Sequence, residues 1–123
     1  MLRVLSVNAN LKEMALYHFY KMPIAVELVV INFADVDYVI DTLHLELNVK
    51  GIKVGNCVKT DDIRVYPKGD KIITCNIIVD VENVGIEVQT LMELFTTKKQ
   101  DAKIRVTGWY HSQIGKVLIN EKL

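Results

Sequence analysis

Hydrophobic and polar residues alternate along most of the chain with a period of two. From Leu43 to Val49 every second residue is apolar, and the positions between them are polar. This alternation is typical of a β-strand with one buried face and one exposed face. Lys50 and Gly51 interrupt the pattern, which resumes over Ile52–Gly55. We therefore predict a β-hairpin or a bulged bend, in which Gly51 takes a backbone conformation that other residues avoid.

Similar patterns predict strands in most of the remaining chain. Residues 71–81 alternate over a long stretch, and Pro67-Lys68-Gly69-Asp70 before them is typical of a β-turn, because Pro fixes φ and Gly accepts a positive φ. Asp62–Tyr66 is expected to pair with the long strand across that turn. The other predicted strands are Leu2–Val7, Leu11–Tyr20, Ile24–Ile31, Lys103–Tyr110 and Lys116–Asn120. Ile24–Ile31 is apolar on both faces except for Glu27, and it is predicted to be central.

One segment has a helical period instead. Its apolar residues are Val84, Val88, Leu91, Met92 and Phe95, spaced as on one face of a helix. We predict a helix over Ile86–Thr96 that covers one end of the fold, with Glu87 near its start and Lys98-Lys99 after its end, as suits the helix dipole. Seven to nine strands with one short helix are typical of an antiparallel β-sandwich. The mostly-β chain is thus expected to form a single domain, 1–123, with a fibronectin-III-like or immunoglobulin-like fold.

Composition narrows the classes of partner. The chain has 123 residues, half of them hydrophobic, which is the balance of an ordered domain. Fifteen basic residues balance fifteen acidic ones, whereas nucleic-acid binding usually needs a basic excess, so no nucleic-acid partner is expected. Zero net charge gives little colloidal repulsion, which favours a protein partner or self-association. The sequence contains no apolar run long enough for a membrane span or an export signal. We expect a soluble protein that is cytoplasmic or part of a virion.

No local motif predicts catalysis. The three histidines do not lie at metal-ligand spacing from one another or from cysteine, and no G-x-S-x-G is present. Asp61 and Asp62 are adjacent, so on a strand they would point to opposite faces. We predict no catalytic residue, no metal and no cofactor. His44 is expected to point outward and to form a surface pair with Glu46.

Cys57 and Cys75 are too few for a disulfide framework. Cys75 lies within a strand pattern, which favours a buried free thiol. A Cys57–Cys75 bridge remains the alternative.

Aromatic side chains provide the candidate interface residues, because Trp and Tyr are enriched at binding hot spots. Trp109 and Tyr110 end one strand, and Tyr17, Phe19 and Tyr20 cluster early in the chain. Packing in the core is the alternative role for all five. The alternation places Trp109 on the more polar face of its strand, which makes it the best candidate for an anchor. Residues 1–20 are a possible interaction segment, since an unpaired edge strand there can add to the sheet of a neighbour.

Residues 24–123 resemble the water-stress-and-hypersensitive-response (WHy) domain, the folded branch of the late embryogenesis abundant proteins. The resemblance rests on Val26–Ala34, Leu45–Gly55, the Pro67-Lys68-Gly69 turn, Ile72–Val81, the helix with Leu91, and Ile104–Gly108. Phe33 stands where the family has proline. The resemblance implies a fibronectin-III-like sandwich without catalytic residues that acts in stress protection or as an accessory module.

Two functions follow as expectations. The first is a non-catalytic binding or accessory module of this family that acts through surface contacts. The alternative is a structural subunit of a larger assembly, such as a virion decoration, capsid or tail component. An enzyme is not expected.

Overall fold

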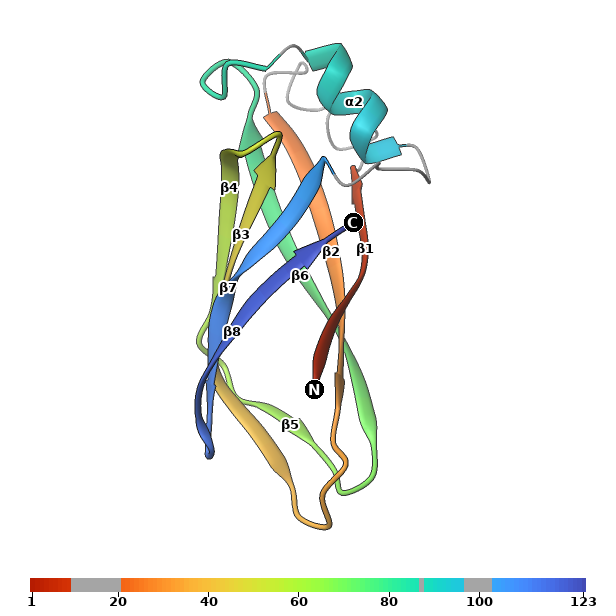
Figure 1. Cartoon of the computed structure of the whole chain (residues 1–123), viewed down its shortest axis with the longest axis vertical. Coiled ribbons are helices and arrows are strands. Elements are labelled where there is room, and N and C mark those ends of the chain that lie inside the picture. Colours follow the sequence, from red (N-terminus) through yellow and green to blue (C-terminus); the bar gives the residue numbers. More distant parts are fainter. Residues whose placement is uncertain (10–20, 87, 97–102) are drawn as a thin grey trace.

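The computed structural model describes residues 1–9, 21–86, 88–96 and 103–123. These residues form a β-sandwich with one helix at its end, as predicted (Figure 1). The elements in chain order are β1 (Leu2–Ala9), β2 (Lys21–Ile31), β3 (Tyr38–Val49), β4 (Ile52–Lys59), β5 (Ile63–Val65), β6 (Asp70–Asp80), α2 (Val88–Thr96), β7 (Ile104–Ser112) and β8 (Gly115–Lys122).

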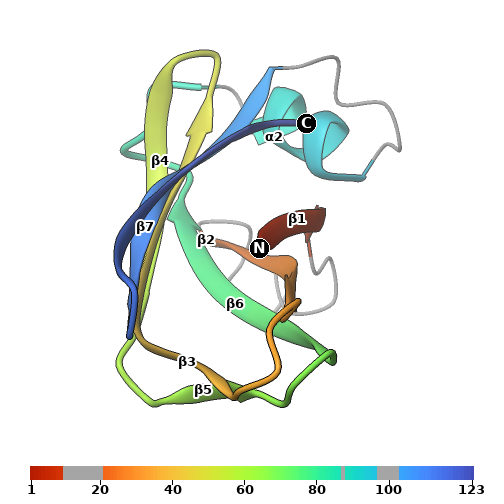
Figure 2. The same cartoon turned by 60° about the horizontal axis from the view of Figure 1, so that its bottom comes forward.

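The strands form two antiparallel sheets that face each other (Figure 2). The three-stranded sheet has the order β1-β2-β6, and the five-stranded sheet has the order β4-β3-β7-β8 with β5 paired to one end of β3. These orders correspond to the A–B–E and C′–C–F–G sheets of immunoglobulin-like sandwiches. β2 is central in its sheet, which confirms the prediction from its apolar pattern. The predicted strand Leu11–Tyr20 falls outside the described residues.

The inward faces of both sheets supply the core. In β3 the buried residues include Leu43, Leu45, Leu47 and Val49, the same set that the alternation assigns to the inner face. The helix α2 closes one end of the core, where Leu91 and Phe95 are fully buried and the helix contacts β1. It begins at Val88 rather than at the predicted Ile86. Glu87, Lys98 and Lys99, assigned above to the helix dipole, fall outside the described residues.

Different contacts close the two long sides of the sandwich. On one side β4 packs closely against β6, and a Cβ on Gly55 would lie 2.5 Å from Cγ2 of Ile77. On the other side Glu121 of β8 binds β1 through two bonds. Its Oε1 accepts from Nε of Arg3 at 3.1 Å, and its Oε2 accepts from the backbone N–H of Val4 at 2.8 Å. The two sheets are thereby fixed relative to each other along both edges.

The β3–β4 hairpin forms as predicted. Lys50 and Gly51 occupy the turn with φ values of 50° and 82°. Two consecutive positive φ values characterise the two-residue turns that match the twist of a hairpin.

Two predictions around residue 67 are corrected. The turn exists, with the N–H of Gly69 donating to the carbonyl of Tyr66 at 3.0 Å, but Lys68 and not Gly69 carries the positive φ, 57°. β5 does not pair with β6 across this turn. It pairs with Tyr38–Ile40 at the start of β3, because β3 is long enough to extend past β4 and leave an edge there for β5.

Candidate functional site

A row of four side chains crosses the outer face of the five-stranded sheet. Val58 of β4 pairs with His44 of β3, His44 pairs with Trp109 of β7, and Trp109 pairs with Leu118 of β8. Directly paired residues on one face of a sheet contact each other. We call Val58, His44, Trp109 and Leu118 the Trp109 row. Leu118 is 77% exposed and Val58 is 52% exposed, so the row presents apolar surface to solvent.

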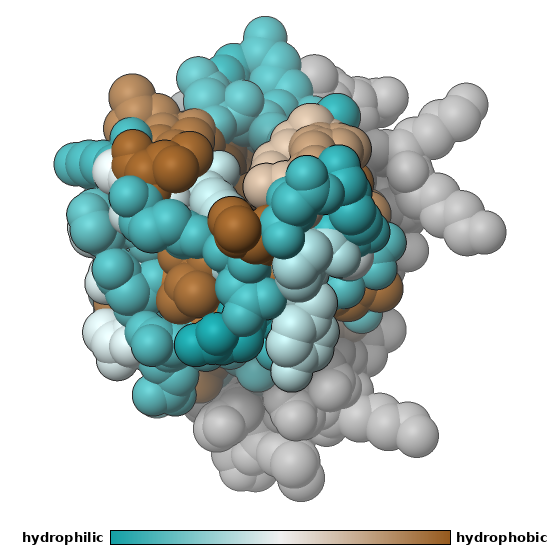
Figure 3. Space-filling view, turned by 90° about the horizontal axis from the view of Figure 1, so that it is seen from below, coloured by the Kyte–Doolittle hydropathy of each residue, from teal (hydrophilic) through white to brown (hydrophobic). Residues whose placement is uncertain are grey.

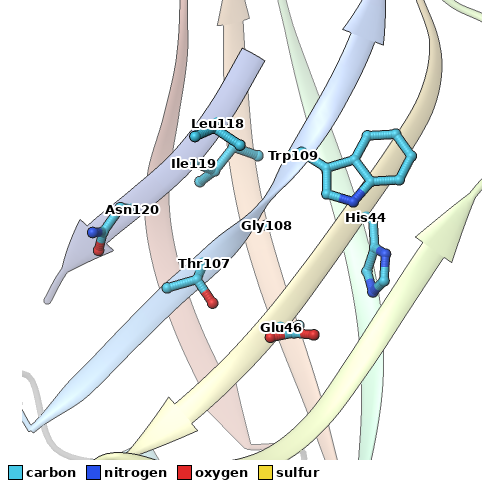
Figure 4. A pocket seen from close by; sticks show the side chains of 8 residues that line it. All are labelled: His44, Glu46, Thr107, Gly108, Trp109, Leu118, Ile119 and Asn120. Atoms are coloured by element: carbon cyan, nitrogen blue, oxygen red, sulfur yellow. The ribbon is translucent and has the colours of Figure 1, made fainter. Parts of the chain in front are cut away.

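A shallow groove of about 360 Å³ follows the middle of this row. Figure 4 shows the side chains that line it, from β3, β7 and β8. Gly108 lies in its wall, between Thr107 and Trp109. At Gly108 the backbone has a φ of 149° and passes against the carbonyl of His44, where a Cβ would clash. The close approach of β3 and β7 at this point sets the position of Trp109 over β3.

Two neighbours hold the indole of Trp109 in place. The His44 ring meets it edge-on, with ring centroids 5.8 Å apart and an angle of 63° between the planes. The Nζ of Lys116 lies 4.9 Å from the indole centroid, within the range of a cation–π interaction. Both contacts restrain the indole in the free protein.

Polar groups surround the indole. Nε2 of His44 is buried and has no hydrogen-bond partner within the described residues. Glu46, on the same face, forms its ion pair with Nζ of Lys53 at 3.2 Å. The predicted His44–Glu46 surface pair is therefore replaced by the His44–Trp109 contact and the Glu46–Lys53 ion pair. For His44 the difference arises because its directly opposite cross-strand neighbour, Trp109, lies closer than a residue two positions away on the same strand.

The structure separates the predicted interface residues. Trp109 lies on the outer face, as its strand pattern indicates. Tyr110 lies on the opposite face and is only 5% exposed, so its side chain belongs to the core. Burial raises the pKa of Tyr110 to about 12, with a contribution from the neighbouring Tyr38 hydroxyl. Three other candidates, Tyr17, Phe19 and Tyr20, fall outside the described residues.

The described part of the N-terminal segment 1–20 forms β1, an edge strand of the three-stranded sheet. Its register shifts between Val4 and Ser6. A shift of this kind is one way in which proteins protect an edge strand from pairing with a neighbour.

Sequence reasoning missed a second apolar surface, at the end of the sandwich opposite α2. Phe33 and Val36 of the β2–β3 loop, Tyr66 after β5, and Ile114 of the β7–β8 turn are between 66% and 75% exposed. We call these four residues the loop tip. Seen from this end, apolar patches lie among polar ones (Figure 3). The available signal was the presence of large apolar residues in or next to the segments between the predicted strands.

Hydrogen bonds hold the loops of the tip together. Nδ2 of the buried Asn32 donates to the carbonyls of Val36 and Tyr66, at 2.8 and 3.1 Å. Nε2 of Gln113 donates to the carbonyl of Asp37 at 2.6 Å. These hydrogen bonds therefore restrain the backbone of the loops from which the exposed apolar side chains of the loop tip project.

Other polar groups form pairs rather than larger clusters. Nδ1 of His111 lies 2.8 Å from Oδ2 of Asp41, and this hydrogen bond lowers the pKa of Asp41. The hydroxyl of Ser112 points inward and accepts a hydrogen bond from Tyr38. Within the described ranges, no three His, Cys, Asp or Glu side chains are grouped to hold a metal ion. In the same ranges no helix has the length and apolar character needed to cross a bilayer.

Both cysteines are free thiols. Cys75 is buried, as predicted, and Cys57 is partly exposed. Burial, together with a smaller effect of the nearby Cys57, raises the pKa of the Cys75 thiol to about 12. Cys75 is therefore a poor nucleophile.

Comparison with known proteins supports the fold but identifies no family or function. No protein-family model matches the sequence, and no curated protein does. A crystal structure of a protein from Archaeoglobus fulgidus is similar, with a TM-score of 0.53, 16% identity, and coverage of 98% of this chain and 96% of the other. An X-ray structure of a Northeast Structural Genomics Consortium target, SoR45, gives a TM-score of 0.51 and 12% identity over 99% and 81% of the two chains. At these identities the likeness concerns the fold alone.

Proposed function

We propose that this protein is a non-catalytic binding module that acts through the outer face of its five-stranded sheet. The observation that carries the proposal is the Trp109 row, in which an ordered indole lies beside the exposed Leu118. Tryptophan is among the residues most enriched at binding hot spots. The resemblance to the WHy domain supports the same role, because it implies a sandwich that acts through its surface.

The order of the indole supports a role as an anchor. Immobilising a flexible side chain on binding costs about 0.5–1.5 kcal/mol. His44 and Lys116 already restrain Trp109 in the free protein, so much of this cost is avoided. Nε2 of His44, which has no hydrogen-bond partner in the described part of the chain, is a further polar group with which a partner can form a hydrogen bond.

The polar pairs support a role without catalysis. His111 and Asp41 have the geometry of a base and the group that orients it, but the adjacent Ser112 hydroxyl faces the core and bonds to Tyr38. Cys75 is buried and keeps its proton at neutral pH. Neither Ser112, beside the His111–Asp41 pair, nor Cys75 is therefore an activated nucleophile at the surface.

Site-specific photo-crosslinking tests the proposal. A photoreactive amino acid replaces Leu118 in one variant and the exposed Asn76, on the outer face of the other sheet, in a control. Both are irradiated in an extract of the source cells. We expect a discrete adduct from position 118 that disappears when Trp109→Ala is added, and no such adduct from position 76. Equal adducts with and without Trp109 contradict the proposal.

The loop tip favours a second candidate function, that of a structural subunit in a larger assembly such as a virion decoration, capsid or tail component. The four large apolar side chains project from loops that hydrogen bonds hold together. Such a surface is suited to burial in a permanent interface between subunits. Light scattering over a range of protein concentrations tests this candidate. A defined oligomer that is lost on Phe33→Ser with Ile114→Ser supports it, whereas a monomer of 14.0 kDa at every concentration contradicts self-assembly through the tip.

A further inference from the structure

A second hollow on the outer face of the five-stranded sheet is lined by positive charge. It measures about 560 Å³ and lies beside the β3–β4 hairpin. Four of its lining residues are basic, and we call them the basic end: Lys50, Lys103, Arg105 and Lys122. The lining residues that the structure describes include no carboxylate. These four side chains form no ion pair with the described part of the chain.

The charge of this face is unbalanced in a chain of zero net charge. Lys116, above Trp109, extends the positive charge along the sheet. Of the neighbouring carboxylates, Glu46 forms an ion pair with Lys53 at 3.2 Å, and Asp41 is hydrogen-bonded to Nδ1 of His111 at 2.8 Å. Like charges gathered without counter-charges attract an anionic partner and repel a cationic one.

The apolar and basic features lie on the same strands. Trp109 and Arg105 both face outward from β7 and are four residues apart, which corresponds to about 13 Å along a strand. Leu118 and Lys122 repeat this spacing on β8. The Trp109 row and the basic end are therefore two parts of one surface, with Thr107 and Asn120 between them.

We infer that this surface binds an extended acidic segment of a protein partner. A large apolar side chain of the segment packs on Trp109 and Leu118, and carboxylates about four residues away in the segment meet the basic end. The charge complementarity of the basic end selects the partner, and the Trp109 row anchors it. This inference rests on the proposed function and specifies the chemistry of the partner.

Peptide selection on the intact protein tests the inference. A random dodecapeptide library displayed on phage is selected against the wild-type protein, and the enriched peptides are synthesised and titrated. Because Trp109 is the only tryptophan, its fluorescence reports binding at the proposed site. The titrations are repeated with Arg105→Gln/Lys122→Gln, with Trp109→Ala, and with a control of equal charge change, Lys21→Gln/Lys71→Gln, at exposed positions of the three-stranded sheet. Binding to Trp109→Ala is measured by calorimetry.

We expect enriched peptides that combine one large apolar residue with a nearby acidic cluster. Their affinity should fall about five- to tenfold in Arg105→Gln/Lys122→Gln, should weaken as salt is raised, and should stay unchanged in the control pair. Peptides that need Trp109 but are neutral or basic overturn the inference and leave the proposed function standing. Failure to enrich any peptide that depends on Trp109 contradicts both. Tighter binding of a single-stranded oligonucleotide than of the peptides also overturns the inference.

Discussion

The backbone of Gly108 lies against the carbonyl oxygen of His44, on neighbouring strands of the five-stranded sheet. A Cβ at position 108 would overlap that oxygen, and φ is 149°, a value that L-residues rarely adopt. Backbone atoms cannot move aside as a flexible side chain can. The contact therefore requires glycine, and it holds β3 and β7 at the spacing that places Trp109 beside His44.

We expect Gly108→Ala to lower the free energy of unfolding by roughly 3 kcal/mol or more, from overpacking together with backbone strain. Gly85→Ala is the control, because φ is also positive there, 70°, but no atom lies within 4 Å of the added Cβ. Strain alone should cost about 1 kcal/mol at that position. Urea denaturation measures both variants. Equal losses would show that the contact with His44 is not the cause.

Lys116 restrains the indole of Trp109 through the cation–π contact at 4.9 Å. We expect Lys116→Met to lower the unfolding free energy by about 0.5–1 kcal/mol and to raise the quenching of Trp109 fluorescence by acrylamide, because the indole becomes more mobile. Lys122→Met, on the same strand face, removes the same charge farther from the ring and should leave the quenching unchanged. Identical quenching in both variants would contradict the restraint.

The sequence alone predicts much of this fold, because alternation reports which face of each strand is buried. The inner residues of β3, the central place of β2, the outward direction of Trp109 and the burial of Cys75 all follow from it. These properties depend on neighbours within one strand. They need no knowledge of which strands pair.

The Trp109 row depends on the register in which neighbouring strands pair. The alternation of apolar and polar residues along one strand does not report that register. Val58, His44, Trp109 and Leu118 come from four strands and form a row only because those strands pair as they do. The same limit explains why β5 was assigned to β6 instead of β3. The positive φ of Lys68 was missed because glycine, next in the sequence, is the residue that usually takes that conformation.

Asn32 organises the loop tip from within. Its Nδ2 donates to the carbonyls of Val36, Val65 and Tyr66, and its Oδ1 accepts from the N–H of Ala34 at 3.0 Å. We expect Asn32→Asp to lower the unfolding free energy by about 2–4 kcal/mol, because a carboxylate has nearly the same shape but cannot donate, and the carbonyls would face a buried negative charge.

Asn83→Asp is the control for this substitution, since Asn83 is exposed and its side-chain amide donates to Oδ2 of Asp80 at 2.8 Å. Asn83→Asp should lower the unfolding free energy by less than about 1 kcal/mol. Thermal unfolding near neutral pH compares the two. If the variants lose the same stability, Asn32 does not organise the loops.

Cys75 and Cys57 differ in exposure, and this difference predicts their reactivity. The Cys75 thiol is buried with a pKa of about 12, so it should resist alkylation by iodoacetamide at pH 8 until the protein unfolds. The partly exposed Cys57 should react in the folded state. Peptide mapping by mass spectrometry after timed labelling measures both rates, and Cys57→Ser isolates the behaviour of Cys75. Rapid labelling of Cys75 in that folded variant would contradict its burial.

Tyr110 gives the fold a dependence on alkaline pH. Its pKa is about 12 in the folded protein, against an ordinary value of 10.0. Between these values the unfolded chain releases the phenol proton while the folded protein keeps it, so stability falls as the pH rises. The contribution is present in full below pH 10 and is lost by about pH 12, and it amounts to roughly 2–3 kcal/mol. Cys75 acts in the same direction from about pH 9 upward, because its pKa is also raised, from 9.0 to about 12.

Tyr110→Phe separates this contribution from general alkaline unfolding. At neutral pH the variant should lose about 1 kcal/mol, because the buried Tyr110 hydroxyl interacts with the neighbouring Tyr38. Above pH 10 its stability should decline less steeply than that of the wild type, so that the two curves converge and then cross before pH 12. Tyr66→Phe is the matched control, because it removes the same hydroxyl from a side chain that is 71% exposed. Denaturant titrations at intervals from pH 8 to pH 12 give the slopes, and parallel curves for wild type and Tyr110→Phe would rule out Tyr110 as their source.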